Sequence, residues 1–182
     1  MNLAYLVLAA SALTQPTPAD DPTLTWIDVD LDGLADLYVL EPGAPDRLLA
    51  NLGDGNFENR TDRAGLAGLK GSRSVHWSDT NDDTFPDLLV VNADGSLKLL
   101  QTSGAWQFAD ATRSSGLAGY RGVTSASWFD YDGDGHLDLQ LSTQAGPELL
   151  HREADGSYRS LIALPELQTG ARAAANCTMI PG

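Results

Sequence analysis

The sequence predicts an all-β protein built from three repeats, each with four short strands. An acidic loop recurs with its first aspartate at Asp28, Asp79 and Asp130, so that both intervals are 51 residues. A tryptophan precedes each loop by two residues, and no segment shows a sustained helical periodicity. A fixed period of this length is typical of repeat architectures. The three tryptophans are Trp26, Trp77 and Trp128.

The first 22 residues are expected to precede the repeats. Residues 1–12 form an apolar run ending in Ala10-Ser11-Ala12, a small-x-small pattern that predicts a signal peptide. The run is too short to cross a bilayer as a helix, so no membrane span is expected. Alternatively, these residues form a strand of a preceding repeat in a chain cut from a longer protein. Residues 13–22 contain three prolines and predict an extended linker.

The repeats are expected at residues 23–72, 73–123 and 124–168. In the first repeat we expect strands at residues 23–28, 35–40 and 47–52 and a fourth strand from Phe57. The second repeat predicts strands at residues 75–78, 87–92, 97–101 and 108–111. The third predicts strands at residues 125–129, 137–142, 148–152 and 158–162, with one residue fewer in the turn between its second and third strands. Residues 169–182 lose the pattern and predict an irregular tail.

Each acidic loop has oxygen-bearing side chains at positions 1, 3, 5 and 9. Carboxylates this close repel one another unless a cation lies among them. Oxygen ligands in a flexible loop suit Ca²⁺, whereas the lack of clustered His or Cys argues against zinc. We therefore expect up to three Ca²⁺ ions, with the backbone carbonyl at position 7 as a further ligand. The candidate metal ligands are Asp28, Asp30, Asp32, Leu34 and Asp36; Asp79, Asn81, Asp83, Phe85 and Asp87; and Asp130, Asp132, Asp134, His136 and Asp138.

The three loops differ in two positions that affect ion binding. Gly33 and Gly135 stand at position 6, where a left-handed turn would fold the loop around the ion. The middle loop has Thr84 there, and a β-branched residue is strained in that conformation. The middle loop also has Asn81, a neutral ligand, at position 3. It is therefore predicted to be the weakest Ca²⁺ site.

The composition supports metal loops and excludes some partners. The chain holds 20 Asp but only 5 Glu, and 11 of the Asp occupy candidate ligand positions. Short acidic side chains suit tight metal-binding turns. The formal charge of −14, which three Ca²⁺ ions would reduce to −8, disfavours nucleic acids and anionic membrane surfaces as partners. The single cysteine, Cys177, cannot form an internal disulfide.

Two other interpretations of the loops can be set aside. An EF-hand requires a bidentate acid at position 12, where this chain has Val39, Val90 and Leu141. A glycosidase carboxylate pair would be a single centre, whereas these carboxylates occur in all three repeats. No nucleophile elbow, phosphate loop or dinucleotide fingerprint is present in the sequence, so we do not expect an enzyme.

Further motifs add a family resemblance. Residues 47–57, which end in Asn51-Leu52-Gly53-Asp54-Gly55-Asn56-Phe57, and two Gly-Leu-Ala-Gly connectors accompany the loops. Together they resemble the FG-GAP/VCBS repeat family, which includes integrin-alpha-like and cartilage-acidic-protein-like repeats, over about residues 23–165. The resemblance implies a β-propeller of four-stranded blades with Ca²⁺ between the first two strands of each blade. Family propellers have about seven blades, so the three visible blades are expected to belong to a larger propeller, to form an open array, or to be completed by a partner chain.

The resemblance also carries the functional expectation. It implies a secreted, periplasmic or cell-surface module that binds a protein or carbohydrate ligand, as in cell adhesion, with calcium mainly structural. An alternative is that the blades are the non-catalytic propeller portion of a larger secreted enzyme. A third interpretation is a purely structural remnant.

Overall fold

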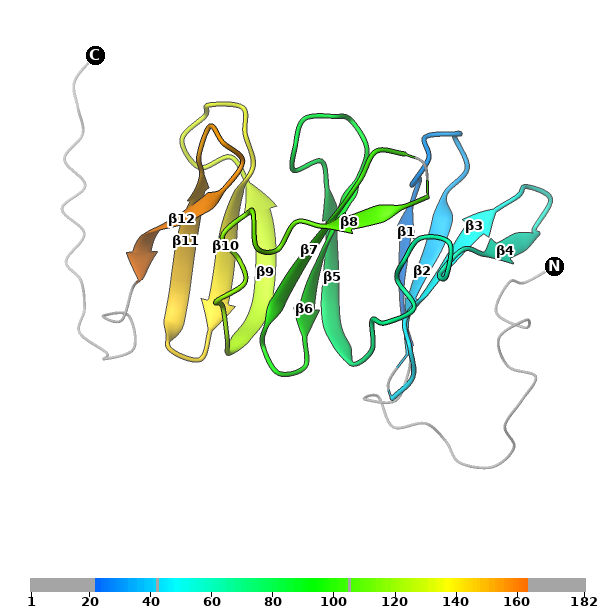
Figure 1. The fold of residues 1–182 in the computed structure, drawn as a ribbon, viewed down its shortest axis with the longest axis horizontal. Coiled ribbons are helices and arrows are strands. Elements are labelled where there is room, and N and C mark those ends of the chain that lie inside the picture. The colour runs from blue at the N-terminus through cyan, green and yellow to red at the C-terminus, as the bar shows by residue number, and fades with distance from the viewer. Residues whose placement is uncertain (1–21, 42, 105, 164–182) are drawn as a thin grey trace, which may run out of the picture.

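The computed structural model describes residues 22–41, 43–104 and 106–163, and within them the chain forms twelve strands and no helix. The strands make three four-stranded antiparallel sheets, which stand in a row in chain order (Figure 1). The predicted all-β class and the three four-stranded blades are therefore confirmed. The expected signal peptide, nearly all of the expected linker and the expected tail lie outside the described residues. None of the described segments is a helix that could cross a membrane.

Each sheet, called a blade below, is a simple meander in which consecutive strands pair. Blade 1 contains β1 (Thr23–Ile27), β2 (Asp36–Leu40), β3 (Arg47–Asn51) and β4 (Phe57–Asn59). Blade 2 contains β5 (Ser72–Ser78), β6 (Asp87–Asn92), β7 (Leu97–Thr102) and β8 (Phe108–Asp110). Blade 3 contains β9 (Val123–Phe129), β10 (Asp138–Thr143), β11 (Gly146–Arg152) and β12 (Tyr158–Ala163).

Three strands begin earlier than the sequence predicts. β5 starts at Ser72 rather than Val75, β9 at Val123 rather than Ser125, and β11 at Gly146 rather than Glu148. In β5 the register shifts between Ser72 and Ser74, so the extension is a bulged backbone pairing that leaves no apolar alternation in the sequence. The expected one-residue deletion in blade 3 is confirmed, because Leu150 pairs with Leu139 as Leu100 pairs with Leu88.

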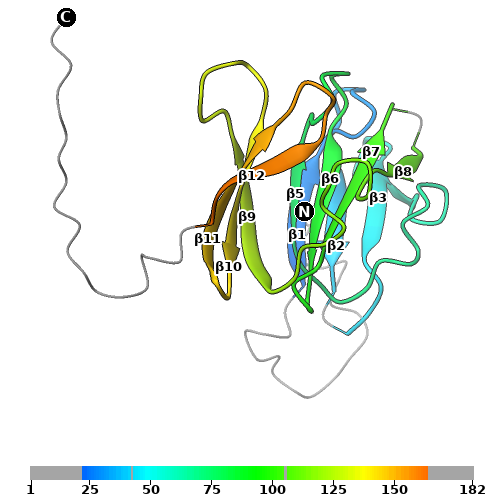
Figure 2. The ribbon, with the colours of Figure 1, turned by 60° about the vertical axis from the view of Figure 1, so that its left-hand side comes forward.

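The repeated tryptophans mark one face of each sheet, which we call the tryptophan face. Cross-strand pairing places Trp77 beside Leu88 and Leu100 on this face. Trp77 packs against blade 1, with its ring centroid 5.6 Å from that of Tyr38, and Trp128 packs in a second cluster that joins blades 2 and 3. Blade 2 therefore stacks on blade 1, and blade 3 on blade 2, each through its own tryptophan face. Figure 2 shows blade 3 beside blade 2 from a second direction.

The opposite face of each sheet, the back face, changes along the chain. In blade 1 it presents Tyr38 and Leu40, which are buried against blade 2. In blade 2 the equivalent residues are Leu89 and Val91, which are buried against blade 3. In blade 3 they are Gln140, which is exposed, and Ser142, which is partly buried. The second strand of blade 3 is therefore polar on its back face where the other two are apolar, although the paired residues Leu149 and Pro147 add apolar side chains to this face.

The tryptophan face of blade 1 is uncovered by the described residues. Its Trp26 is 49% exposed and its Leu24 is 47% exposed. Trp26 contacts Phe57 within its own blade, with ring centroids 6.2 Å apart. The second and third tryptophans thus pack between blades, whereas Trp26 differs because no described blade precedes it.

Candidate metal centres

The three acidic loops connect the first and second strands of the blades and lie at one edge of the row of sheets (Figure 1). Each loop contains two left-handed residues, at positions 4 and 6. At position 6, φ is 88° for Gly33, 78° for Thr84 and 89° for Gly135, which confirms the predicted turn. At position 4, Leu31 and Asp82 have φ of 59° and 64°, and these left-handed residues were not expected from the sequence. Two such residues, separated by one position, allow the loop to close on itself.

The aspartate at position 1 gathers backbone N–H groups of its own loop. The donors are the residues at positions 5 and 6, at distances of 2.7 to 3.2 Å. These bonds favour the charged carboxylate, and the N–H of Gly135 is the main cause that lowers the pKa of Asp130. Asp130 therefore keeps its negative charge at neutral pH. The three acceptors are Asp28, Asp79 and Asp130.

The aspartate at position 9 starts the second strand and is almost fully buried, with exposed fractions of 1%, 0% and 1% in the three blades. One of its oxygens accepts a hydrogen bond from the N–H at position 2 of the loop. Its other oxygen accepts the N–H of the last residue of the third strand. This carboxylate therefore holds the loop against the sheet, and its ligation of an ion stays a prediction. The three residues are Asp36, Asp87 and Asp138.

Burial disfavours the charged form of two position-9 carboxylates, Asp36 and Asp87. Desolvation raises the pKa of Asp36, and it raises the pKa of Asp87 to about 6 despite the hydrogen bonds from Thr80 and Thr102. A cation beside these groups would favour the charged form and oppose that shift. A bound cation would thus stabilise the buried carboxylates of loops 1 and 2 more than it would stabilise exposed carboxylates.

Loop 1 brings three carboxylates together. One oxygen each from Asp28, Asp30 and Asp32 lies within 4.8 Å of the other two. The Oδ1 atom of Asp30 is buried and has no hydrogen-bond partner among the described residues. A buried, unpaired carboxylate oxygen in an anionic cluster fits a metal ligand, because a cation would supply the missing partner.

Loop 3 forms two overlapping clusters. Asp130, Asp132 and Asp138 place one oxygen each within 4.8 Å of the others, and Asp132 and Asp134 are equally close to a ring nitrogen of His151. The Nδ1 atom of His151 lies 3.1 Å from an Asp138 oxygen. In loop 3 a ring nitrogen therefore lies beside the carboxylate oxygens.

Loop 2 differs because an amide stands among the carboxylates. Nδ2 of Asn81 donates to Asp83 at 3.0 Å, and Oδ1 of Asn81 accepts the N–H of Asp83 at 3.1 Å. The amide N–H thus partly neutralises Asp83 without an ion. This contact agrees with the prediction that loop 2 is the weakest site, which itself stays a prediction.

Position 7 supplies a backbone group to each loop. Its N–H donates to the aspartate at position 5, at 2.8 or 2.9 Å in all three loops. This bond fixes the aspartate across the turn. The role of the position-7 carbonyl as a ligand stays a prediction. The residues are Leu34, Phe85 and His136.

A contact that the sequence did not reveal joins loop 1 to blade 2. The indole N–H of Trp106, in the turn between β7 and β8, donates to Oδ2 of Asp30 at 2.9 Å. Trp106 is 8% exposed and has φ of 55°, although the equivalent residues in the other blades are Gly55 and Gly156. The Arg60 guanidinium lies 5.6 Å from the centroid of the indole ring. A bulky side chain therefore occupies a left-handed position and ties a candidate ligand to the next blade.

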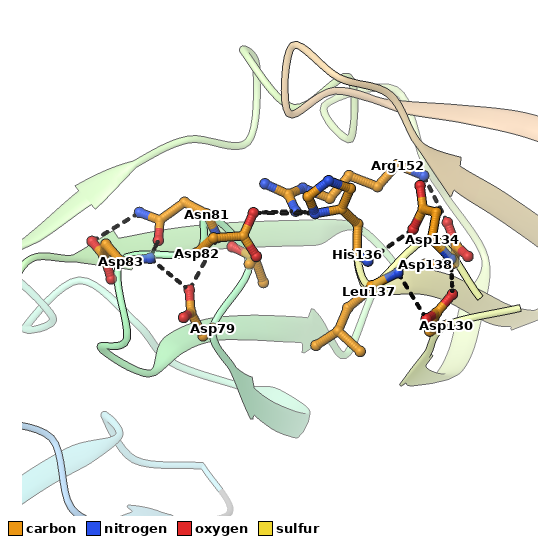
Figure 3. Close-up of polar contacts among 12 residues, drawn as sticks. Asp79, Asn81, Asp82, Asp83, Asp130, Asp134, His136, Leu137, Asp138 and Arg152 are labelled. Carbon is orange, nitrogen blue, oxygen red and sulfur yellow. Dashed lines mark hydrogen bonds and ion pairs between the residues drawn. The ribbon is translucent and has the colours of Figure 1, made fainter. Parts of the chain in front are cut away.

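A second unforeseen contact joins loop 2 to blade 3 (Figure 3). Oδ2 of Asp82 accepts a hydrogen bond from Nη1 of Arg152 at 2.8 Å and lies 3.2 Å from Nδ1 of His136. The bond from Arg152 is the main cause that lowers the pKa of Asp82. Loops 1 and 2 thus each contact the blade that follows them. A comparison of the repeats could have indicated Trp106, because it replaces glycine, but it carries no sign of the Arg152 contact.

Comparison with known proteins supports a repeat assignment. A family model described as FG-GAP-like repeat matches residues 28–90 and again residues 79–140. A 73-residue segment is 37% identical to flagellin B3 of Thermococcus kodakarensis. That match covers 40% of this chain and 24% of the flagellin, so the chain spans about a quarter of this relative.

Proposed function

This chain belongs to the FG-GAP-like repeat family, and on that premise we propose that it is a calcium-binding repeat module of the cell exterior. In this proposal Ca²⁺ in the loops stabilises the blades, and the module binds a protein or glycan partner without catalysing a reaction. Secretion, adhesion and the identity of the ion belong to the proposal.

The observation that carries the calcium proposal is the anionic cluster of loop 1. At 4.8 Å, two unit charges repel by about 1 kcal/mol in bulk water and by about 3 kcal/mol at an effective dielectric constant near 20. Asp30 adds a buried oxygen without a hydrogen-bond partner among the described residues. A bound divalent cation would remove this repulsion and supply that partner.

The ligand chemistry favours Ca²⁺ over transition metals in loops 1 and 2. Their candidate ligands are carboxylate, amide and backbone oxygens, which suit a hard cation of flexible coordination. The position-1 and position-5 aspartates are oriented by backbone N–H groups. These bonds preorganise the loops, so little ordering is required when an ion binds.

A structural role for calcium follows from the contacts of the loops. Asp30 bonds to Trp106 of blade 2, and Asp82 bonds to Arg152 of blade 3. An ion that fixes loop 1 or loop 2 would therefore also fix the junction with the next blade. Because binding to the folded state adds to its stability, the free energy of unfolding should rise with calcium concentration.

Thermal unfolding with calcium and with chelator tests this proposal. At a calcium concentration about 100 times the dissociation constant, each site should add about 2.7 kcal/mol, and the melting temperature should rise by several degrees. Magnesium at the same concentration is the control, because it tolerates these irregular loops less well. If calcium leaves the melting temperature unchanged and isothermal titration calorimetry detects no heat of calcium binding, the proposal is refuted.

A further inference from the structure

The two junctions between blades differ at one equivalent place. At the first junction the Trp106 side chain fills the space between loop 1 and blade 2, packed in a cluster that includes Val29, Ala50 and Ala64. At the second junction the residue equivalent to Trp106 is Gly156, which also has a left-handed backbone, with φ of 81°. The second junction therefore lacks the indole that closes the first.

A cavity of about 270 Å³ occupies this part of the second junction. Its lining includes the buried residues Thr80, Ser115 and Arg152, the partly buried residue Gln101 and the exposed residues Asn81 and Asp155. Gly156 also lines the cavity. The space that an aromatic ring takes at one junction is thus open at the other.

The cavity wall is polar where the first junction is apolar. Thr80 stands in the place of Val29, Gln101 in the place of Ala50, and Ser115 in the place of Ala64. Each replacement adds a hydroxyl or an amide to a wall that otherwise packs against the indole. An aromatic side chain of a partner would leave these groups without hydrogen bonds, so the wall favours a polar ligand.

Hydrogen bonds within the cavity wall orient these polar groups but leave some of their donors and acceptors unused. Nε2 of Gln101 donates to Oγ1 of Thr80 at 3.0 Å, and Oγ of Ser115 donates to a backbone carbonyl at 3.3 Å. Lone pairs remain on Ser115 and on the carbonyl oxygen of Gln101, and one N–H of the Gln101 amide remains. Arg152 and Asp155 contribute opposite charges. The lining therefore suits a neutral ligand whose groups both donate and accept, as sugar hydroxyls do.

We propose that this cavity between blades 2 and 3 binds one ring of a neutral saccharide. The proposal rests on the binding role proposed above and names its site and ligand class. The cavity is slightly smaller than the pockets of about 300 Å³ and more that hold drug-sized ligands, which suits a single small ring. A neighbouring hollow of about 380 Å³ shares Asn81 and Gln101 with it, so a second ring would extend there.

The test is a titration of the full chain, in the presence of calcium, with the methyl glycosides of glucose, galactose and mannose. Saturation-transfer NMR measures the binding of each glycoside. We expect at least one of the three to bind with a dissociation constant on the order of 1 mM, as befits a ligand of this size. Gly156→Trp restores the residue type of the first junction and should weaken binding at least tenfold. A Cβ at Gly156 meets no atom within 4 Å, so the added side chain has room to enter.

Two further variants separate filling of the cavity from other effects. Gly156→Ala imposes the same backbone strain without filling the cavity, and its affinity should stay within about threefold of the unsubstituted chain. Gln101→Ala introduces the residue of blade 1 and should weaken binding at least threefold, because it removes one wall amide. The melting temperature of each variant in calcium checks that it is folded.

The outcomes distinguish this proposal from the calcium proposal. Calcium binding without binding of any of the three glycosides would overturn the cavity proposal alone. Glycoside binding that Gly156→Trp leaves unchanged in a folded protein would also overturn it. Glycoside binding that persists in a chelator, with no calcium binding, would instead refute the calcium proposal and leave the cavity in place.

Discussion

Thr84 is a point of stored strain in loop 2. Its φ of 78° lies in the left-handed region, where Gly33 and Gly135 stand in the other loops. Such a conformation costs an L-residue about 1–2 kcal/mol relative to glycine. The side chain of Thr84 is exposed, and its backbone N–H donates to Asp79 at 2.7 Å, a bond that glycine would keep.

Thr84→Gly should therefore stabilise the protein. The relief of strain, about 1–2 kcal/mol, is partly offset by about 0.5–1 kcal/mol for the greater freedom of glycine in the unfolded chain. We expect a net gain of about 0.5–1 kcal/mol in the free energy of unfolding, measured by urea denaturation in a chelator. The affinity of loop 2 for calcium should also rise, because the loop then needs less energy to hold its bound shape.

The reciprocal substitution Gly135→Thr in loop 3 provides a matched control. A Cβ at Gly135 meets no atom within 4 Å, so the change introduces backbone strain without a steric clash. We expect it to lower the free energy of unfolding by about the amount that Thr84→Gly raises it. If Thr84→Gly is neutral or destabilising while Gly135→Thr is harmless, the strain argument is wrong.

Three other predictions concern single contacts. Trp106→Phe removes the indole N–H that donates to Asp30, so it should lower the free energy of unfolding by about 1.5–3 kcal/mol in chelator. The loss should be smaller in calcium, because a bound ion would then pair with Asp30. Equal losses in urea denaturation with chelator and with calcium would contradict this. Gly95→Ala places a Cβ 2.5 Å from backbone of the connector to blade 3 and should cost about 3 kcal/mol, against about 1 kcal/mol for Gly55→Ala, whose Cβ is unobstructed. Burial raises the pKa of Asp87 from 3.8 to about 6, so in chelator the contribution of Asp87 to the free energy of unfolding should fall by about 2 kcal/mol as pH rises from about 4 to 6. Urea denaturation of the unsubstituted chain and of Asp87→Asn at both pH values measures this contribution, and an equal pH dependence of the two would refute it.

Most of the fold could be predicted from the repeat pattern of the sequence. The cross-strand alignment of Leu49, Leu100 and Leu150 follows from leucine pairs that recur at nearly constant spacing. Alternation and turn residues located all twelve strands, although three strand starts were placed too late. β5 and β9 begin with a backbone bulge or a polar run, and β11 begins with Gly146 and Pro147, which are residues typical of turns. Periodicity reports side-chain burial, and it says little where the backbone alone makes the pairing.

The candidate sites were only partly predictable. The spacing of the loop aspartates identified the clusters, but it could not separate Asp36, which holds its loop against β3, from the more exposed Asp32. The contacts of Asp30 with Trp106 and of Asp82 with Arg152 join residues 76 and 70 positions apart. Pairs this distant depend on how one blade stacks on the next, which no local pattern encodes.

The two ends of the stack of blades differ in how well they would accept a further sheet. A fourth sheet placed beyond β12 would have to cover Gln140 and Ser142 and meet their hydrogen-bonding needs, which is costly in a dry contact. A sheet placed ahead of β1 would instead cover Trp26 and Leu24 and gain the burial that Trp77 already has. A sheet ahead of β1 would thus gain more apolar burial than one beyond β12, and a neighbour of blade 3 would need hydrophilic groups opposite Gln140 and Ser142.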